Sequence, residues 1–365
     1  AVGTVTRNGL PPALVLGCTR FAGGVPVQVH THAANDFELD AKDLEDCITP
    51  KSKVLILSYP NNPTGAVLPR EKLEAVARVA IKHDLFVICD EIYSELAYDG
   101  FIQVSMASLP GMWERTMIIS GFSKAFAMTG FRLGYMAAPQ PYVVAAAKIH
   151  QYTIMCASRQ SQVAAYYALK HGRETGYADV IRMRESYNQR RRLMLKAFRD
   201  MGLECFEPRG AFYMFPSIKK TGLSSEAFCE KLLQEKAVIC VPGSAFGDSG
   251  EGHIRCCYAT AISKLQEAFE RMYLPRLGLR FAMPRAFDRL TWLGRGPQES
   301  YPDMKTGALL DIYQAQVEDT HEPYIYPQEN GSHADTQFVA ITDVSGCGLM
   351  IAGEDFSFSA RHYTQ

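Results

Sequence analysis

The sequence lacks a charge imbalance, a long apolar run and, with 2 tryptophans, most of the indole side chains expected for its length. Its 365 residues carry 38 Lys+Arg against 39 Asp+Glu, so no global field attracts nucleic acid or a membrane surface. No apolar run approaches the ~20 residues that a membrane span needs. The first thirty residues lack the basic, apolar and small-residue regions of a signal peptide. We therefore expect a cytoplasmic protein without a membrane or nucleic-acid partner.

The ten cysteines form no C-x-x-C pair, which predicts reduced thiols and not a disulfide framework. His30 and His32 have alternate spacing, but no carboxylate or thiol cluster accompanies them, so we expect no metal site. The basic run 190–192 falls in a predicted helix and is interpreted as a solvated face.

Strand and helix patterns alternate from about residue 50 to 272. Short β-branched runs predict strands at 53–60, 85–90 and 116–120, and apolar residues at helical spacing predict helices at 71–84, 141–150, 158–171, 178–200, 224–235 and 261–272. This order predicts an α/β fold, a mostly parallel sheet with helices on both faces. Shorter strands near 203–207, 211–216, 237–241 and 253–258 predict a small α+β domain after it.

Helical patterns stop at Tyr273. Short alternating runs separated by turn residues then predict an antiparallel β-sandwich, and this segment carries 7 Lys+Arg against 12 Asp+Glu, a shift that suggests a different origin. The expected organisation is an irregular start (1–21), a large domain (22–150), a helical connection with the small domain (151–272) and the sandwich (273–365).

Polar side chains follow three of the predicted strands. Asn62 comes after the first, Asp90 ends the second with Tyr93 close behind, and Lys124 follows the third. Ligands of open parallel sheets bind beyond the carboxyl ends of the strands, so these groups are expected to converge. Singly, each has a structural alternative: turn chemistry for Asn62, a helix N-cap for Asp90, half-buried packing for Tyr93 and a solvated face for Lys124.

The segments around these residues resemble the class I/II aminotransferases, pyridoxal-phosphate enzymes of fold type I. The resemblance covers about residues 22–272 and rests on four motifs in order: YPNNPTGAVL, DEIYSELAY, SGFSKAFAMTGFRLGY and FGDSGEGHIRCCYAT. It implies a pyridoxal 5'-phosphate-dependent transfer of an amino group from an L-amino acid to a 2-oxo acid. β-Elimination is an alternative reaction on the same scaffold, and the substrate side chain cannot be read from the motifs.

The resemblance implies a role for each strand-end residue. Lys124 would hold the cofactor as a Schiff base and shuttle a proton, which requires partial desolvation of its amine. Asp90 would keep the pyridine nitrogen protonated, so that the ring withdraws electrons. Asn62 and Tyr93 would hydrogen-bond the phenolate oxygen of the ring.

The resemblance also implies anion-binding residues. Arg132 would bind the cofactor phosphate through paired charge-assisted hydrogen bonds. Ser123 is the expected second phosphate contact, with Ser120 as the alternative, because Gly121 stands where many relatives keep a serine. Arg255 would bind the substrate α-carboxylate, with a surface arginine as its alternative reading. Phe212, in PRGAFYMFP, either lines the pocket or belongs to the core.

Relatives in this family carry an N-terminal segment that residues 1–21 do not resemble. That segment supplies backbone donors for the phosphate, an aromatic ring stacked on the cofactor and residues that reach across a homodimer. Its lack would impair activity, since small positioning errors cost about 100-fold in rate, and would weaken the dimer.

The last part of the chain, about 274–365, resembles the C-terminal β-sandwich of large β-galactosidases, mainly through W-x-G-x-G-P-x-E-x-Y-P-D at 292–303. Those enzymes use paired carboxylates in a separate barrel. Glu299, Asp303 and Glu329 fall in loop signals and are not expected to be catalytic. The alternative functions are therefore a β-galactosidase-related fusion product without a catalytic barrel, or a non-catalytic fusion.

Overall fold

The computed structural model describes residues 2–7, 12–272, 339–341 and 349–351. Its strands are β1 (Val2–Arg7), β2 (Gly24–Val29), β3 (Ser52–Ser58), β4 (Phe86–Asp90), β5 (Thr116–Gly121), β6 (Gly134–Ala137), β7 (Tyr213–Met214), β8 (Val241–Pro242), β9 (Ile254–Cys257), β10 (Val339–Ile341) and β11 (Leu349–Ile351). Its α-helices are α1 (Pro12–Phe21), α2 (Ala41–Asp46), α3 (Arg70–Lys82), α4 (Phe122–Ala125), α5 (Gln140–Thr153), α6 (Arg159–Thr175), α7 (Ala178–Asp200), α8 (Ser225–Lys236) and α9 (Ile262–Met272).

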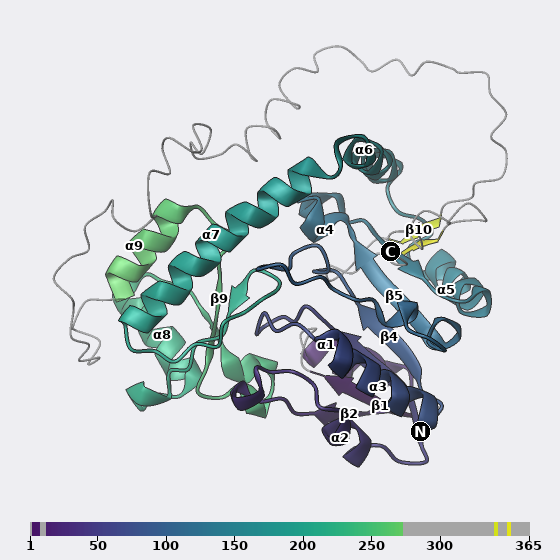
Figure 1. The fold of residues 1–365 in the computed structure, drawn as a ribbon, viewed down its shortest axis with the longest axis horizontal. Coiled ribbons are helices and arrows are strands. Elements are labelled where there is room, and N and C mark those ends of the chain that lie inside the picture. The colour runs from purple at the N-terminus through teal and green to yellow at the C-terminus, as the bar shows by residue number, and fades with distance from the viewer. Residues whose placement is uncertain (1, 8–11, 273–338, 342–348, 352–365) are drawn as a thin grey trace, which may run out of the picture. The chain divides into compact units, whose positions relative to one another are not determined.

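A six-stranded sheet in the order β2-β1-β3-β4-β5-β6 is the largest sheet among the described residues (Figure 1). β1 to β5 pair in parallel, and β6 is antiparallel to β5. The mostly parallel α/β sheet predicted from the sequence is thus confirmed. Because β3, β4 and β5 are parallel neighbours, their carboxyl ends lie at one edge of the sheet, where the polar residues follow.

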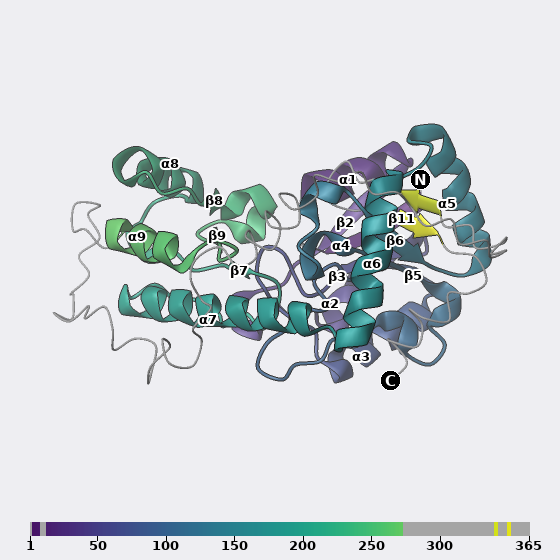
Figure 2. The same ribbon diagram turned by 90° about the horizontal axis from the view of Figure 1, so that it is seen from above.

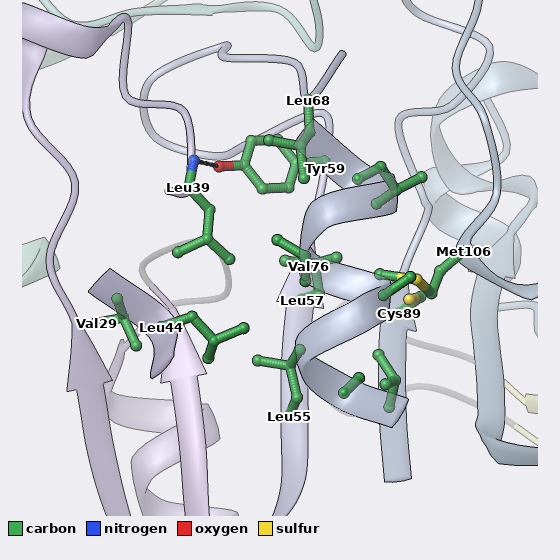
Figure 3. Packing of buried hydrophobic residues seen from close by; sticks show 14 of the residues in the cluster. Val29, Leu39, Leu44, Leu55, Leu57, Tyr59, Leu68, Val76, Cys89 and Met106 are labelled. Carbon is green, nitrogen blue, oxygen red and sulfur yellow. Dashed lines mark hydrogen bonds between the residues drawn. The ribbon is translucent and has the colours of Figure 1, made fainter. Parts of the chain in front are cut away.

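Apolar side chains of α3 cover one face of this sheet. Leu73 and Val76 of α3 belong to the same buried cluster as Leu55 and Leu57, which lie two positions apart on one face of β3. Figure 3 shows Val76 beside Leu57. The hydroxyl of Tyr59 extends this packing, because it accepts a hydrogen bond from the Leu39 backbone N–H at 2.9 Å. The burial fixes the end of β3 and therefore the turn that follows it.

The opposite face of the sheet is covered by α5. Successive residues of a strand point to opposite faces, and Val87 of β4 joins the α3 cluster. Its neighbour Phe86 stacks instead on Tyr142 of α5, with ring centroids 4.0 Å apart. Helices therefore lie on both faces of the sheet, as predicted.

The expectation of an irregular start at residues 1–21 is corrected, because this segment contains β1 and α1. β1 pairs with β2 on one side and β3 on the other, but its sequence VGTVTR has neither the continuous apolar run typical of a central parallel strand nor a strict alternation. In α1, Gly17 interrupts the helical pattern. These two features hid the elements from periodicity.

A second, three-stranded sheet in the order β7-β9-β8 is antiparallel throughout. It confirms short strands near three of the predicted positions, but residues 203–207 form no strand. Leu203 N instead donates to the Phe198 carbonyl oxygen of α7 at 2.9 Å, so the alternation there reflects burial and not strand pairing. Figure 2 shows α7 extending from α6 to α9, and α7 also contacts β7.

The side chain of Arg191 in α7 is 1% exposed, so the interpretation of the run 190–192 as a solvated face is wrong for Arg191, whereas Arg192 is 67% exposed as expected. The Arg191 guanidinium donates to the Pro208 carbonyl oxygen at 2.9 Å and forms an ion pair with Asp99. A buried charge is tolerated when its hydrogen bonds are satisfied. Arg191 therefore fastens α7 to the segment that leads into β7, on which part of the site depends.

The predicted β-sandwich at 273–365 lies outside the described residues, apart from the antiparallel pair β10 and β11. The division into the domains 22–150 and 151–272 stays a prediction. Among the described helices, none combines the length and apolar content that a bilayer crossing requires.

Candidate active site

The turn after β3 uses its two asparagines differently. Asn61 is fully buried, and its Oδ1 accepts hydrogen bonds from Thr64 N at 3.3 Å and Thr64 Oγ1 at 2.8 Å. Asn61 therefore supplies the turn chemistry that was the structural alternative for Asn62. The Asn62 side chain instead accepts a hydrogen bond from Arg255 Nη1 at 2.9 Å.

Two glycines bring this turn against the segment before β7. Gly210 N donates to the Gly65 carbonyl oxygen at 2.9 Å. A Cβ on Gly65, whose φ is +74°, would lie 2.4 Å from Pro208 Cβ, and one on Gly210 would lie 2.4 Å from Pro60 Cβ. Only residues without a side chain permit this approach, which helps to place Asn62 within reach of Arg255 on β9.

Asp90 and Tyr93 lie at the end of β4 and are both buried. Asp90 Oδ1 accepts a hydrogen bond from Ile92 N at 3.1 Å, which orients the carboxylate. The Tyr93 hydroxyl lies 3.2 Å from the Tyr213 hydroxyl. Burial raises the pKa of Tyr93 well above its ordinary value, and the neighbouring Tyr213 hydroxyl and then the Asp90 carboxylate raise it further. Tyr93 is therefore a phenol at neutral pH and can donate a hydrogen bond.

Lys124 lies in the short helix α4, directly after β5, and is half-buried. Its Nζ is 5.9 Å from the ring centroid of Tyr93 and 5.6 Å from that of Phe212. The two rings pack edge-to-face with centroids 5.3 Å apart. The amine thus lies against an aromatic wall that removes part of its hydration.

Packing explains why a glycine occupies position 121. In the β5–β6 pair Gly121 faces Gly134, and a Cβ on Gly121 would lie 2.9 Å from Gly134 Cα. A serine would not fit there without a shift of the backbone. Ser120 Oγ donates to the Glu91 carbonyl oxygen at 3.4 Å, while Ser123 is buried beside Lys124.

Arg132 follows Lys124 on the same segment, and its backbone is left-handed, with φ +52°. Its Nη1 donates to the Thr129 carbonyl oxygen at 2.7 Å. Left-handed non-glycine residues cost free energy and are concentrated at functional sites. The phosphate roles of Arg132 and Ser123 stay predictions.

Tyr213, which sequence reasoning missed, lies between Tyr93 and Arg255 and contacts both. The Arg255 guanidinium carbon lies 4.6 Å from the Tyr213 ring centroid, and the Tyr213 hydroxyl meets that of Tyr93. The motif PRGAFYMFP predicted a strand near the substrate, with Phe212 and not Tyr213 as the candidate pocket residue. Contacts therefore run without a break from Lys124 through Tyr93 and Tyr213 to Arg255 and Asn62.

Glu91, beside Asp90, was also missed. Its Oε1 accepts a hydrogen bond from Ser105 Oγ at 2.7 Å, whereas its buried Oε2 has no hydrogen-bond partner in the part of the chain that the structure describes. Burial raises the pKa of Glu91 from its ordinary 4.5 to about 7, and the Asp90 carboxylate adds to the rise. The side chain is therefore protonated in mildly acidic solution.

We expect Glu91 to lower the stability of the fold as pH rises from about 4.5 to 7. In this window the folded state keeps the proton that the unfolded state has lost, so the free energy of unfolding falls by on the order of 2–3 kcal/mol and then levels. Urea unfolding at pH 5 and pH 8 measures the difference. Glu91→Gln should lack this component, and the exposed control Glu235→Gln should keep it; equal pH dependence in all three proteins would contradict the assignment.

The donor set fits pyridoxal 5'-phosphate. A buried carboxylate suits a protonated pyridine nitrogen, an amine against aromatic rings suits an aldehyde, and a protonated phenol suits the phenolate oxygen. The described residues contain no group of three or more His, Cys, Asp or Glu side chains arranged to hold a metal ion.

Residues 16–272 match the family model of aminotransferase class I and II. Residues 245–365 match the family model of the beta galactosidase small chain. A putative aminotransferase of Bacillus subtilis is 53% identical over 251 residues, 69% of this chain and 64% of the relative. Aromatic-amino-acid aminotransferase 2 of Thermococcus litoralis is 48% identical over 261 residues, 72% of this chain and 65% of the relative. The chain thus spans slightly less than two thirds of the length of these relatives.

Solved structures give the same result for the fold. An aromatic aminotransferase from Pyrococcus horikoshii superposes with a TM-score of 0.70 at 44% identity, covering 74% of this chain and 72% of that one. Aspartate aminotransferase from Thermus thermophilus with maleate superposes with a TM-score of 0.70 at 36% identity, covering 76% and 70%.

Proposed function

We propose that this chain, which belongs to the family of class I and II aminotransferases, transfers an amino group from an L-amino acid to a 2-oxo acid with pyridoxal 5'-phosphate. The continuous contact path from Lys124 to Arg255 carries the proposal, since it joins an amine to an anchor for a carboxylate. Relatives named for aromatic amino acids and for aspartate both resemble the chain, so the proposal is limited to the α-amino acid class.

The bound cofactor would supply an aldehyde and an electron-withdrawing ring. Lys124 would provide the amine that carries it and would move a proton at the substrate Cα. Asp90 would hold the proton of the ring nitrogen, and Tyr93 would donate a hydrogen bond to the phenolate oxygen. Arg132 and Ser123 would bind the phosphate group.

Arg255 would bind the substrate α-carboxylate through two parallel N–H donors. Asn62 and the Tyr213 ring hold the guanidinium from two directions, so its planar group is oriented before substrate arrives. This arrangement suits a group common to all amino acids.

Arg255→Leu should raise the amino-acid concentration needed for half-maximal single-turnover rate by about 30-fold or more, the equivalent of at least 2 kcal/mol for a lost buried charge contact. Cofactor binding should change little. Single-turnover assays with an amino-acid panel measure both, and they also test the proposed reaction through formation of the 2-oxo acid.

The exposed control Arg182→Lys should behave as the parent protein. An unchanged half-maximal concentration in Arg255→Leu would remove Arg255 from the substrate site. Release of ammonia in place of amino transfer would favour β-elimination.

For the last part of the chain we propose a segment derived from a β-galactosidase-type sandwich, which makes the chain a fusion. The match at 245–365 supports this origin. The 40–53% identity to aminotransferases favours amino transfer over a glycosidase function. A chromogenic galactoside should therefore remain unhydrolysed.

A further inference from the structure

Two cysteines face each other across β8 and β9, on the face of β9 opposite the Arg255 side chain. Cys240 directly precedes β8 and Cys256 lies in β9, and their Sγ atoms are 3.6 Å apart. Val241 opposes Arg255 in the β8–β9 register, so Cys240 continues that register opposite Cys256.

The register places this pair where cross-strand side chains approach most closely. In an antiparallel ladder, hydrogen-bonded and non-hydrogen-bonded pairs alternate, and the latter have the closer side chains. Gly243 N donates to the His253 carbonyl oxygen at 2.8 Å, which marks 243/253 as a bonded pair. Because the two kinds of pair alternate, Val241 and Arg255 also form a hydrogen-bonded pair, whereas Cys240 and Cys256 form a non-hydrogen-bonded pair. The two sulfurs need to approach by about 1.5 Å to reach the ~2.05 Å of a disulfide.

The two thiols differ in access. Cys240 is half-buried, whereas Cys256 is 7% exposed. The contact with Cys240, together with burial, raises the pKa of Cys256 well above its ordinary value. Cys240 is therefore the thiol that an oxidant reaches first, and Cys256 is placed to resolve the product.

We propose that Cys240 and Cys256 are a modification site at which a peroxide drives formation of a reversible disulfide. The peroxide transfers one oxygen to the Cys240 thiol, giving a sulfenic acid and one water or alcohol. The Cys256 sulfur then attacks the Cys240 sulfur, the S–O bond breaks, and the hydroxyl leaves with the Cys256 proton as water. Two thiols lose two electrons in total, the peroxide gains them, and a dithiol reductant reverses the change.

The site adjoins the residue that is proposed to bind substrate. Arg255 precedes Cys256, and its side chain emerges on the opposite face of β9. A disulfide between Cys240 and Cys256 draws the two strands together next to the Val241–Arg255 pair. It therefore shifts the backbone from which the Arg255 guanidinium extends. On the proposed function, oxidation weakens carboxylate binding.

Peptide mapping of the full chain tests the site without any activity measurement. Trypsin cleavage after Lys236, Arg255 and Lys264 places Cys240 in peptide 237–255 and Cys256 in peptide 256–264. Treatment with hydrogen peroxide should yield these two peptides joined, two hydrogens lighter than their sum, and dithiothreitol should separate them. Peptide 256–264 also contains Cys257, so Cys257→Ser should keep the linkage.

Cys240→Ser and Cys256→Ala should each abolish the linkage, while Cys229→Ala, which changes a neighbouring buried thiol, should retain it. Absence of the joined peptides in the parent protein, or a linkage that survives in Cys240→Ser, would overturn the proposal. Using Cys240→Ser, which changes a half-buried residue, guards against a variant that fails to fold.

Single-turnover assays test the link to Arg255. Oxidation should raise the half-maximal amino-acid concentration of the parent by about tenfold, within the cost of an ångström-scale displacement, and should leave Cys240→Ser unchanged. An equal change in both proteins would refute the link. Failure of the reduced protein to transfer amino groups would count against the proposed function, whereas the joined peptides decide the modification site independently.

Discussion

Lys124→Ala should eliminate covalent attachment of pyridoxal 5'-phosphate and reduce the amino-transfer rate by on the order of 10³–10⁴, because it removes both the amine that carries the cofactor and the group that moves the proton. Alanine occupies the same position in α4 without clashing, so the loss should arise in the site and not in the fold. Absorbance of the added cofactor and single-turnover rates measure the two effects separately.

The control for this prediction is Lys148→Ala, which removes an exposed lysine from α5. It should retain both attachment and rate. If Lys124→Ala still formed the Schiff base with its full absorbance, another lysine would be the carrier and the site would have to be assigned elsewhere.

Asp90→Asn should reduce the amino-transfer rate by about 100-fold or more while leaving attachment at Lys124 intact. The amide can still accept the hydrogen bond from Ile92 N, so the local structure should persist. It carries no charge, however, and a buried charge beside the ring nitrogen is what would keep that nitrogen protonated.

Asp84→Asn is the matched control, because Asp84 lies on the surface with a side chain 91% exposed and pairs only weakly with Arg115. Its rate should match that of the parent protein. A full rate in Asp90→Asn would show that the carboxylate does not act on the cofactor.

Sequence patterns predicted the parts of the fold that depend on local burial. β3, β4 and β5 appear as short apolar runs because both faces of a central parallel strand are covered. The meeting of Asn62, Tyr93 and Lys124 at one region followed from the rule for strand ends. The chemical roles of these residues came from the family resemblance, because the hydrophobic pattern carries no information about them.

The remaining features depend on contacts between distant segments. The Tyr93–Tyr213 contact joins residues 120 positions apart, and nothing in either local pattern indicates it. The buried Arg191 looked like a surface charge because its partners, Asp99 and Pro208, come from other segments. β1 lacks the apolar run that reveals β3 to β5, and Gly17 interrupts the helical period of α1.

The most direct test of the central claim is to trap the cofactor on the protein. The full chain is incubated with pyridoxal 5'-phosphate, reduced with sodium borohydride and digested with trypsin, and the peptides are identified by mass spectrometry. We predict one dominant adduct, on peptide 116–132, where Lys124 is the sole internal lysine and is protected from cleavage by the modification. Adducts spread over exposed lysines, or an unmodified peptide 116–124, would contradict the account.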